Sequence, residues 1–381
     1  MQRYAHRPMK YLLLCLLFIF PTTLFLRTGE VQAASVSPDC GSWNIVKSPN
    51  VPPLSNDYLS GVAAVSANDV WAVGDYIQGS TSYTLIEQWN GSSWSIVSSP
   101  NLGTNDVLAS VAAIEANDIW AAGSYRDSNN HTNTLIEHWD GSSWSIIASP
   151  NRGTSDVLRS IVAVAANDIW VVGDSGTQTL IEHWDGSSWN IIDSPSPGAL
   201  SNFLFGVTAV SSNDVWAVGT YDNASSKFGP SNVHTLTEHW DGSSWSVVSS
   251  PSKGPADLLE DVTAVSANDV WAVGFNGKQL LIEHWNGRKW SFVSDPRPGK
   301  GTSILYQAVA LSANDIWAVG RGDGATLIEQ WNGTSWVIVS SPNASKSDGL
   351  GAVTRVPGTG QLWAVGLFHH KYDYTLTEFY C

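Results

Sequence analysis

The sequence predicts an all-β protein: a seven-bladed β-propeller with four antiparallel strands in each blade. The tryptophans recur on one template, and that template repeats at a period of roughly 45–55 residues, which is typical of propeller blades. No stretch after residue 35 shows sustained helical periodicity. A blade that is apolar on both faces is not stable alone, so we expect the blades to stack around a closed ring.

All 20 tryptophans belong to three columns of this template. The first column comprises Trp71, Trp120, Trp170, Trp216, Trp271, Trp317 and Trp363. The second comprises Trp89, Trp139, Trp184, Trp240, Trp285 and Trp331, with Tyr380 in the seventh place. The third comprises Trp94, Trp144, Trp189, Trp245, Trp290 and Trp336, with Trp43 near the N-terminus. Burying one indole is worth about 5 kcal/mol gross, so we interpret these residues as packing between blades.

Each unit divides into strands a, b, c and d. In the first unit we expect them at residues 62–65, 70–74, 84–89 and 94–98. Strand a is apolar on both sides, as expected for a strand buried on both faces. Asn68-Asp69 forms the a–b turn, and Asn90-Gly91 is a strong hairpin signal between strands c and d. Pro100 ends strand d and discourages pairing at the outer edge.

The seventh unit is split between the two chain ends. Residues 375–381 match strand c, and residues 40–49 match the missing turn and strand d. We therefore expect an N-terminal strand at 43–47 to complete the blade formed by 350–381. Cys40 and Cys381 fall on the two cut ends of one hairpin, so we predict a disulfide between them. Two free thiols are the alternative.

Residues 1–33 have the pattern of a signal peptide, with a basic start, a short apolar stretch and small residues at the end. We therefore expect residues 34–381 to be exported as one propeller domain, secreted or at the cell surface. A retained membrane anchor is less favoured because the apolar stretch is short. The net charge of −15 argues against nucleic acid or an anionic membrane as partner. We expect a monomer.

The b–c and d–a loops vary among units, and both emerge at the same end of a propeller. The b–c loops span residues 75–83, 124–133, 174–178, 220–234, 275–279, 321–325 and 367–374. A rigid frame that carries variable loops on one face is a common way to build a binding site. The candidate ligand-binding residues on these loops are Tyr76, Tyr83, Tyr125, Arg126, Tyr221, Phe228, Phe368, His369 and Tyr372. Neutral variation in solvated loops is the alternative.

Strand a carries one departure from the template. Arg355 takes the register that alanine holds in the other units, for example Ala64 and Ala113. If this register faces the central channel, Arg355 would be its only cation. We therefore add Arg355 to the candidate binding residues, as an anion contact or a plug of the channel.

Strand c carries a repeated acid. The glutamates in this register are Glu87, Glu137, Glu182, Glu238, Glu283, Glu329 and Glu378. Because strand c is third from the axis, neighbouring copies lie far apart, and we expect hydrogen bonds across blade interfaces rather than metal binding or acid–base catalysis. The next position carries histidine or glutamine, such as His138 or Gln88, which suits a polar structural contact. We predict no metal site, no cofactor and no catalytic residues.

The units resemble kelch-type blades and, more closely, the tandem NDVWAVG…LIEHWDGSSW repeats of secreted bacterial propeller proteins, over residues 40–381. No Ser-His-Asp pattern, phosphate loop or zinc spacing is present. We therefore predict a secreted, non-enzymatic binding protein whose partner is a protein or a glycan. The alternative is a carbohydrate-active enzyme, a glycoside hydrolase or lyase, which would need convergent carboxylates near the channel.

Overall fold

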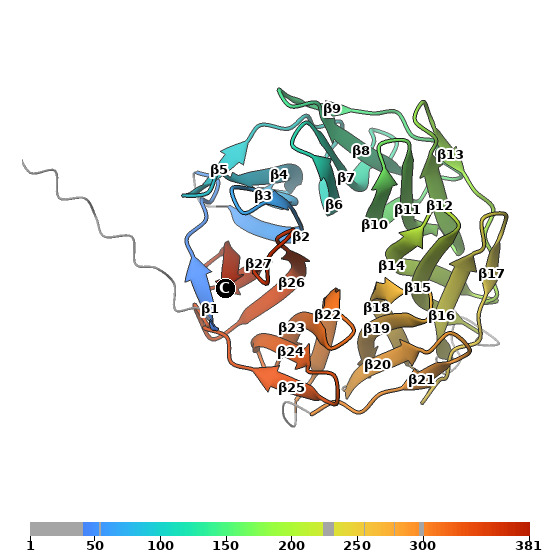
Figure 1. Cartoon of the computed structure of the whole chain (residues 1–381). Helices are drawn as coiled ribbons and strands as arrows, with labels where there is room; N and C mark the ends of the chain where they lie inside the picture. Colours follow the sequence, from blue (N-terminus) through green and yellow to red (C-terminus); the bar gives the residue numbers. More distant parts are fainter. Residues whose placement is uncertain (1–40, 53–54, 224–231, 255, 278, 297–300) are drawn as a thin grey trace, which may run out of the picture. The chain divides into compact units, whose positions relative to one another are not determined.

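The structure is a computed structural model that describes residues 41–381, except 53–54, 224–231, 255, 278 and 297–300. The described residues belong to one compact unit, Pro38–Cys381. Its strands form seven four-stranded antiparallel sheets arranged as blades around an axis (Figure 1). The predicted seven-bladed propeller is therefore confirmed. The expected signal peptide at 1–33, Cys40 and Phe228 lie outside the described residues.

The first three blades follow one another along the chain. Blade 1 comprises β2 (Asn56–Ser66), β3 (Asp69–Gln78), β4 (Thr81–Trp89) and β5 (Trp94–Val97). Blade 2 comprises β6 (Val107–Glu115), β7 (Asp118–Arg126), β8 (Thr132–Trp139) and β9 (Trp144–Ile146). Blade 3 comprises β10 (Asp156–Ala165), β11 (Asp168–Ser175), β12 (Gln178–Trp184) and β13 (Trp189–Ile191).

The next three blades repeat the same order of strands. Blade 4 comprises β14 (Ser201–Ser211), β15 (Asp214–Asp222), β16 (Val233–Trp240) and β17 (Trp245–Val247). Blade 5 comprises β18 (Asp257–Ser266), β19 (Asp269–Asn276), β20 (Gln279–Trp285) and β21 (Trp290–Phe292). Blade 6 comprises β22 (Ser303–Ser312), β23 (Asp315–Gly322), β24 (Ala325–Trp331) and β25 (Trp336–Val339).

Blade 7 joins the two ends of the chain. It comprises β26 (Asp348–Arg355), β27 (Leu362–His369), β28 (Asp373–Tyr380) and β1 (Trp43–Val46). β1 pairs antiparallel with β28 and places Trp43 opposite Tyr380, as the split repeat predicts. The N–H of Gly41 donates to the carbonyl of Cys381 at 2.6 Å. Because Cys40 lies outside the described residues, the Cys40–Cys381 disulfide stays a prediction.

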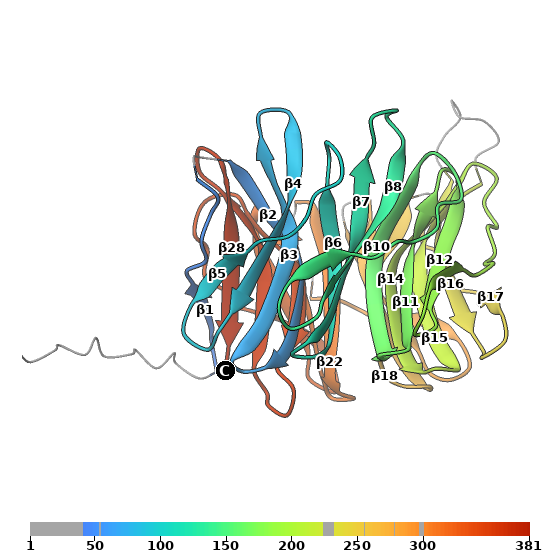
Figure 2. The same ribbon diagram turned by 90° about the horizontal axis from the view of Figure 1, so that it is seen from above.

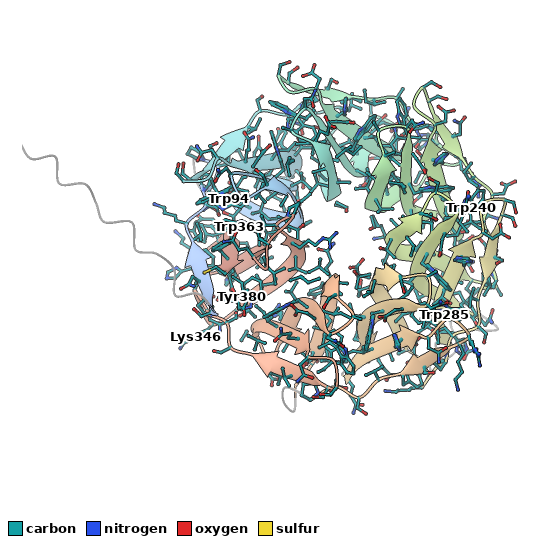
Figure 3. The ribbon with its side chains drawn as sticks, in the orientation of Figure 1. Trp94, Trp240, Trp285, Lys346, Trp363 and Tyr380 are labelled. Atoms are coloured by element: carbon teal, nitrogen blue, oxygen red, sulfur yellow. The ribbon has the colours of Figure 1, made fainter. Side chains whose placement is uncertain are left out.

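The tryptophans pack between neighbouring blades. Trp71 of blade 1 lies 4.9 Å from Trp139 and 5.5 Å from Trp144 of blade 2, measured between ring centroids. The same arrangement recurs at every interface, with Tyr380 in place of one tryptophan between blades 6 and 7. At the junction of blades 7 and 1, Trp363 meets Trp94 at 5.1 Å (Figure 3). The interpretation of these residues as packing between blades is confirmed.

The innermost strands are longer than expected. β2 begins at Asn56, whereas the apolar pattern predicts a start at residue 62. Buried Asp57 lies in this additional stretch of the strand. Its carboxylate accepts a hydrogen bond from the N–H of Val51 in the preceding loop at 2.6 Å. Asp106 and Asp156 accept backbone N–H groups in the same way in blades 2 and 3. The loops that enter these three blades are thereby fixed against the innermost strands.

Candidate functional site

Each innermost strand carries a β-bulge at the same place. In β2 the pairing with β3 shifts between Leu59 and Gly61, which leaves Ser60 as the extra residue. A bulge re-aims the side chain of the extra residue and breaks the regular ladder. We call the seven extra residues the bulge ring: Ser60, Ala109, Arg159, Phe205, Glu260, Tyr306 and Gly351.

All seven residues of the bulge ring line one cavity of about 620 Å³, which we call the channel-mouth cavity. The innermost strands that carry them encircle the centre of the propeller in Figure 1. Asp75, Arg321 and Leu367 also line the cavity. They lie near the ends of β3, β23 and β27, just before the b–c hairpins, which project at one end of the propeller in Figure 2. The cavity therefore lies at the end of the channel that carries the b–c loops, where the sequence predicts a binding face.

In blades 1 to 6 the residue after the bulge binds or closely approaches the neighbouring blade. Ser110 accepts a hydrogen bond from the N–H of Ile161 at 3.3 Å, and Asp261 accepts one from the N–H of Ala308 at 2.9 Å. At Gly206 the blades approach so closely that a Cβ atom would lie 2.6 Å from the Cα of Asp261. The floor of the cavity is therefore fixed by contacts between blades. Burial raises the pKa of Asp261 to about 7.

Arg159 is held in place within the cavity. Its Nε donates to the Oδ1 of Asp174 at 2.7 Å, and its guanidinium lies 5.1 Å from the ring centroid of Phe205 and 6.0 Å from that of Phe203. Asp174 is buried, which raises the pKa of its carboxyl, while Arg159 acts in the opposite direction. The charge of Arg159 is therefore already paired and stacked on an aromatic face.

Glu260 lies in the ring between Phe205 and Tyr306. Burial raises the pKa of the Glu260 carboxyl, and the positive charge of Arg159 counteracts part of that rise. Within the described residues its side chain has no hydrogen-bond partner. Burial and the charge of Glu260 also raise the pKa of Tyr306, against the effect of Arg321. The lining of the cavity thus includes three carboxyl groups, two cations and three aromatic rings.

The opposite wall of the cavity is acidic. Tyr58 donates its hydroxyl hydrogen to Asp373 at 2.7 Å, and burial raises the pKa of that hydroxyl well above its ordinary value. Burial raises the pKa of Asp75 to about 6, although a hydrogen bond from Ser82 lowers it.

The candidate residues predicted on the b–c loops form separate pairs. Tyr76 stacks on Tyr83 with centroids 5.2 Å apart, and Phe368 stacks on Tyr374 at 5.3 Å. The ring of Tyr221 lies 5.3 Å from that of His234, tilted by 36°. Each pair bridges strands b and c of a single hairpin, so these rings stiffen the hairpins around the cavity.

The other predicted candidates lie around the rim or away from it. Tyr125 is half-buried and Arg126 is exposed at the end of β7. His369 contacts Asp373 at 2.7 Å, and Lys371 lies over the ring of Tyr372. Arg355 is exposed and pairs with Leu362 at the a–b end of β26, far along the strand from the bulge. Among the residues described here, none of these candidates lines the channel-mouth cavity, whose cations are Arg159 and Arg321.

Sequence reasoning missed the bulge ring, although a signal exists. In every unit one freely varying residue follows a constant leucine, as in Leu158-Arg159-Ser160 and Leu204-Phe205-Gly206. The residue after it is small or polar, as the contact with the next blade requires. A residue that varies between units, although both of its neighbours are restricted in type, is a residue whose side chain is not needed for packing of the blade.

The strand-c glutamates are fully buried. Burial raises the pKa of Glu87 well above its ordinary value. It raises the pKa to about 8 at the other six positions, Glu137, Glu182, Glu238, Glu283, Glu329 and Glu378. Glu283 accepts a hydrogen bond from Ser250 at 2.8 Å and Glu378 from Ser341 at 3.3 Å, both serines belonging to the preceding blade. The expected bonds across blade interfaces are confirmed at these two sites, with hydroxyl donors. The other five carboxyls have no hydrogen-bond partner in the described part of the chain.

The residues after the glutamates make structural contacts, as predicted. His138 lies 2.9 Å from Asp118, and Gln88 donates to Asp69 at 2.9 Å. Asp118 also accepts a hydrogen bond from the indole of Trp120 at 2.8 Å. Equivalent contacts fix the a–b turn to strand c in blades 1 to 6, whereas blade 7 has Phe379 at this position.

No group of three or more histidine, cysteine, aspartate or glutamate side chains within 41–381, apart from the undescribed gaps, is arranged to hold a metal ion. In the same part of the chain, no helix has both the length and the apolar character needed to cross a membrane.

No protein-family model matches the chain, and no curated protein matches it. Solved structures share its fold. A structure of YCF48 bound to a D1 peptide has a TM-score of 0.58 and 15% identity, covering 90% of this chain and 98% of that one. YCF48 from Cyanidioschyzon merolae gives 0.57 and 15%, with 89% and 98% covered. U3-55K gives 0.60 and 8%, with 89% and 98% covered. At these identities the likeness establishes the fold alone.

Proposed function

We propose that this chain is a secreted, non-catalytic binding protein that holds a segment of a protein partner in the channel-mouth cavity. The observation that carries the proposal is the bulge ring, in which every blade contributes a different residue to one cavity while the tryptophan template stays constant. A fixed frame with one variable register is how a repeat scaffold builds a single site.

The cavity favours a protein segment over a glycan. Its volume of about 620 Å³ lies in the range of ligand pockets, and its lining mixes charged groups with Phe205 and Tyr306. The lining contains no tryptophan, because the indoles are used between blades. The similar fold of YCF48 has been solved with a D1 peptide bound, which adds support for a peptide ligand.

The test is selection of binders from a random 12-residue peptide library displayed on phage, against purified residues 34–381. We expect enriched peptides whose affinity falls at least tenfold when Phe205 and Tyr306 are both changed to alanine. Arg355→Ala, at the other end of the channel, is the control and leaves affinity unchanged. Thermal unfolding of each variant checks the fold. Enriched peptides that bind the cavity variant as well as the parent protein would overturn the proposal.

A further inference from the structure

We propose that the channel-mouth cavity recognises one lysine or arginine side chain of the partner, laid between Phe205 and Tyr306 with its charge on Glu260. The inference rests on the proposed function, in which a protein segment enters this cavity. It concerns which side chain of that segment the cavity selects.

The three residues occupy the same register of three successive blades. Phe205 is the bulge residue of β14, Glu260 that of β18 and Tyr306 that of β22, and all three line the cavity. A carboxylate between two aromatic rings offers a cation both an ion pair and two π faces. Long basic side chains also have an apolar stem that packs against such rings.

The Glu260 carboxylate has unused capacity to accept hydrogen bonds. The Glu260 side chain is half-buried, burial raises the pKa of its carboxyl, and within the described residues nothing donates to it. A partly desolvated carboxylate without donors gains more from an incoming ammonium or guanidinium than a solvated one does.

Arg159 does not satisfy this carboxylate. Its Nε donates to Asp174 at 2.7 Å, and its guanidinium carbon lies over the Phe205 ring, 5.1 Å from the ring centroid. The second cation, Arg321, donates to Ser347 at 2.9 Å on the blade 7 side of the cavity. The stacking of Arg159 on Phe205 also demonstrates that a ring of this cavity accepts a cation against its face.

The charge balance points the same way. The lining includes the carboxyl groups of Asp75, Glu260 and Asp261 against the two cations Arg159 and Arg321, and Arg159 is already neutralised by Asp174. The whole chain carries a net charge of −15. An acidic peptide would meet repulsion on approach and in the cavity, whereas a basic one would be attracted.

The experiment uses peptides enriched from the phage library, measured by isothermal titration against residues 34–381. Each basic position is replaced in turn by norleucine or glutamate. We expect one lysine or arginine at which norleucine weakens binding at least tenfold and glutamate abolishes it. Glu260→Gln should weaken the parent peptide at least tenfold and leave the norleucine peptide unchanged. Because Glu260 accepts no hydrogen bond among the described residues, we expect this variant to fold normally, which thermal unfolding checks.

The matched control is Glu115→Gln, which removes the same charge from an exposed glutamate at the opposite end of an innermost strand. It should leave peptide affinity within twofold, which separates local recognition from overall charge. Phe205→Leu keeps the apolar volume, removes one π face and should weaken the basic peptide selectively. Cavity-dependent peptides that lack an essential basic residue, or that are acidic, would overturn this inference and leave the proposed function standing. Peptides indifferent to every cavity variant would overturn both.

Discussion

The buried glutamates should make the propeller less stable as the pH rises, and Glu182 isolates the effect. Its side chain is fully buried, has no hydrogen-bond partner among the described residues, and has a pKa raised to about 8 by burial and by Asp156. Glu182→Gln keeps the shape of the side chain and removes its titration. The variant should therefore lose the part of the pH dependence that this residue contributes.

The sign follows from proton binding. The ordinary pKa of a glutamate is 4.5, so between pH 4.5 and about 8 the folded protein keeps a proton that the unfolded chain releases. Stability from this group is fully present below pH 4.5 and is lost as the pH rises toward 8. A shift of this size corresponds to roughly 3–5 kcal/mol, at about 1.4 kcal/mol for each pKa unit.

Guanidinium unfolding at pH 5 and pH 8.5 measures the difference. Near pH 5 the variant and the parent protein should have similar free energies of unfolding, and at pH 8.5 the variant should be more stable by about 3–5 kcal/mol. Glu115→Gln, at an exposed site, serves as the control and should change the free energy little at either pH. A stability difference between Glu182→Gln and the parent that is equal at both pH values would refute the reasoning.

Two further predictions concern the seam between the chain ends. Trp43→Ala should lower the free energy of unfolding by about 3–5 kcal/mol in denaturant titration, because Trp43 is 4% exposed and contacts Trp317 and Tyr380; an effect below about 1 kcal/mol would contradict it. Peptide mapping of exported protein without reductant should recover the Cys40 and Cys381 peptides as one disulfide-linked species, whereas free thiols at both positions would disprove the link.

The blade architecture could be predicted because it depends on residue types that recur. Packing between blades follows from Trp71 and its equivalents, and the c–d hairpins follow from Asn90-Gly91 and its equivalents. Because the template occurs seven times, it can be recognised even where one unit departs from it. The split of the last blade followed from the same template, since residues at 43–46 and 375–380 each supply the part that the other lacks. Repetition of the template therefore makes this fold easier to predict from the sequence.

The site could not be predicted by the same means. Every unit has the same bulge, so the bulge does not change the period of the repeat. The spacing of the tryptophans therefore does not reveal it. The length and composition of the loops vary and led to the candidate residues on the b–c hairpins. The lining of the channel-mouth cavity varies instead at single residues inside a constant strand, at Arg159, Phe205, Glu260 and Tyr306. The length of the innermost strands was missed for a related reason, because Asp57 and its equivalents stabilise loop entry through backbone N–H groups.

The bulge also explains how a repeat scaffold acquires one site without losing packing. The leucine before it is buried in the blade, and the residue after it, such as Ser110 or Asp261, binds or approaches the next blade. The extra residue between them is neither part of the regular strand pairing nor needed for contact with the next blade, because it lines the cavity. Substitution there changes the chemistry of the cavity at little cost to the interfaces between blades. Seven such positions on one ring therefore allow the lining of the cavity to change while the tryptophan template stays fixed.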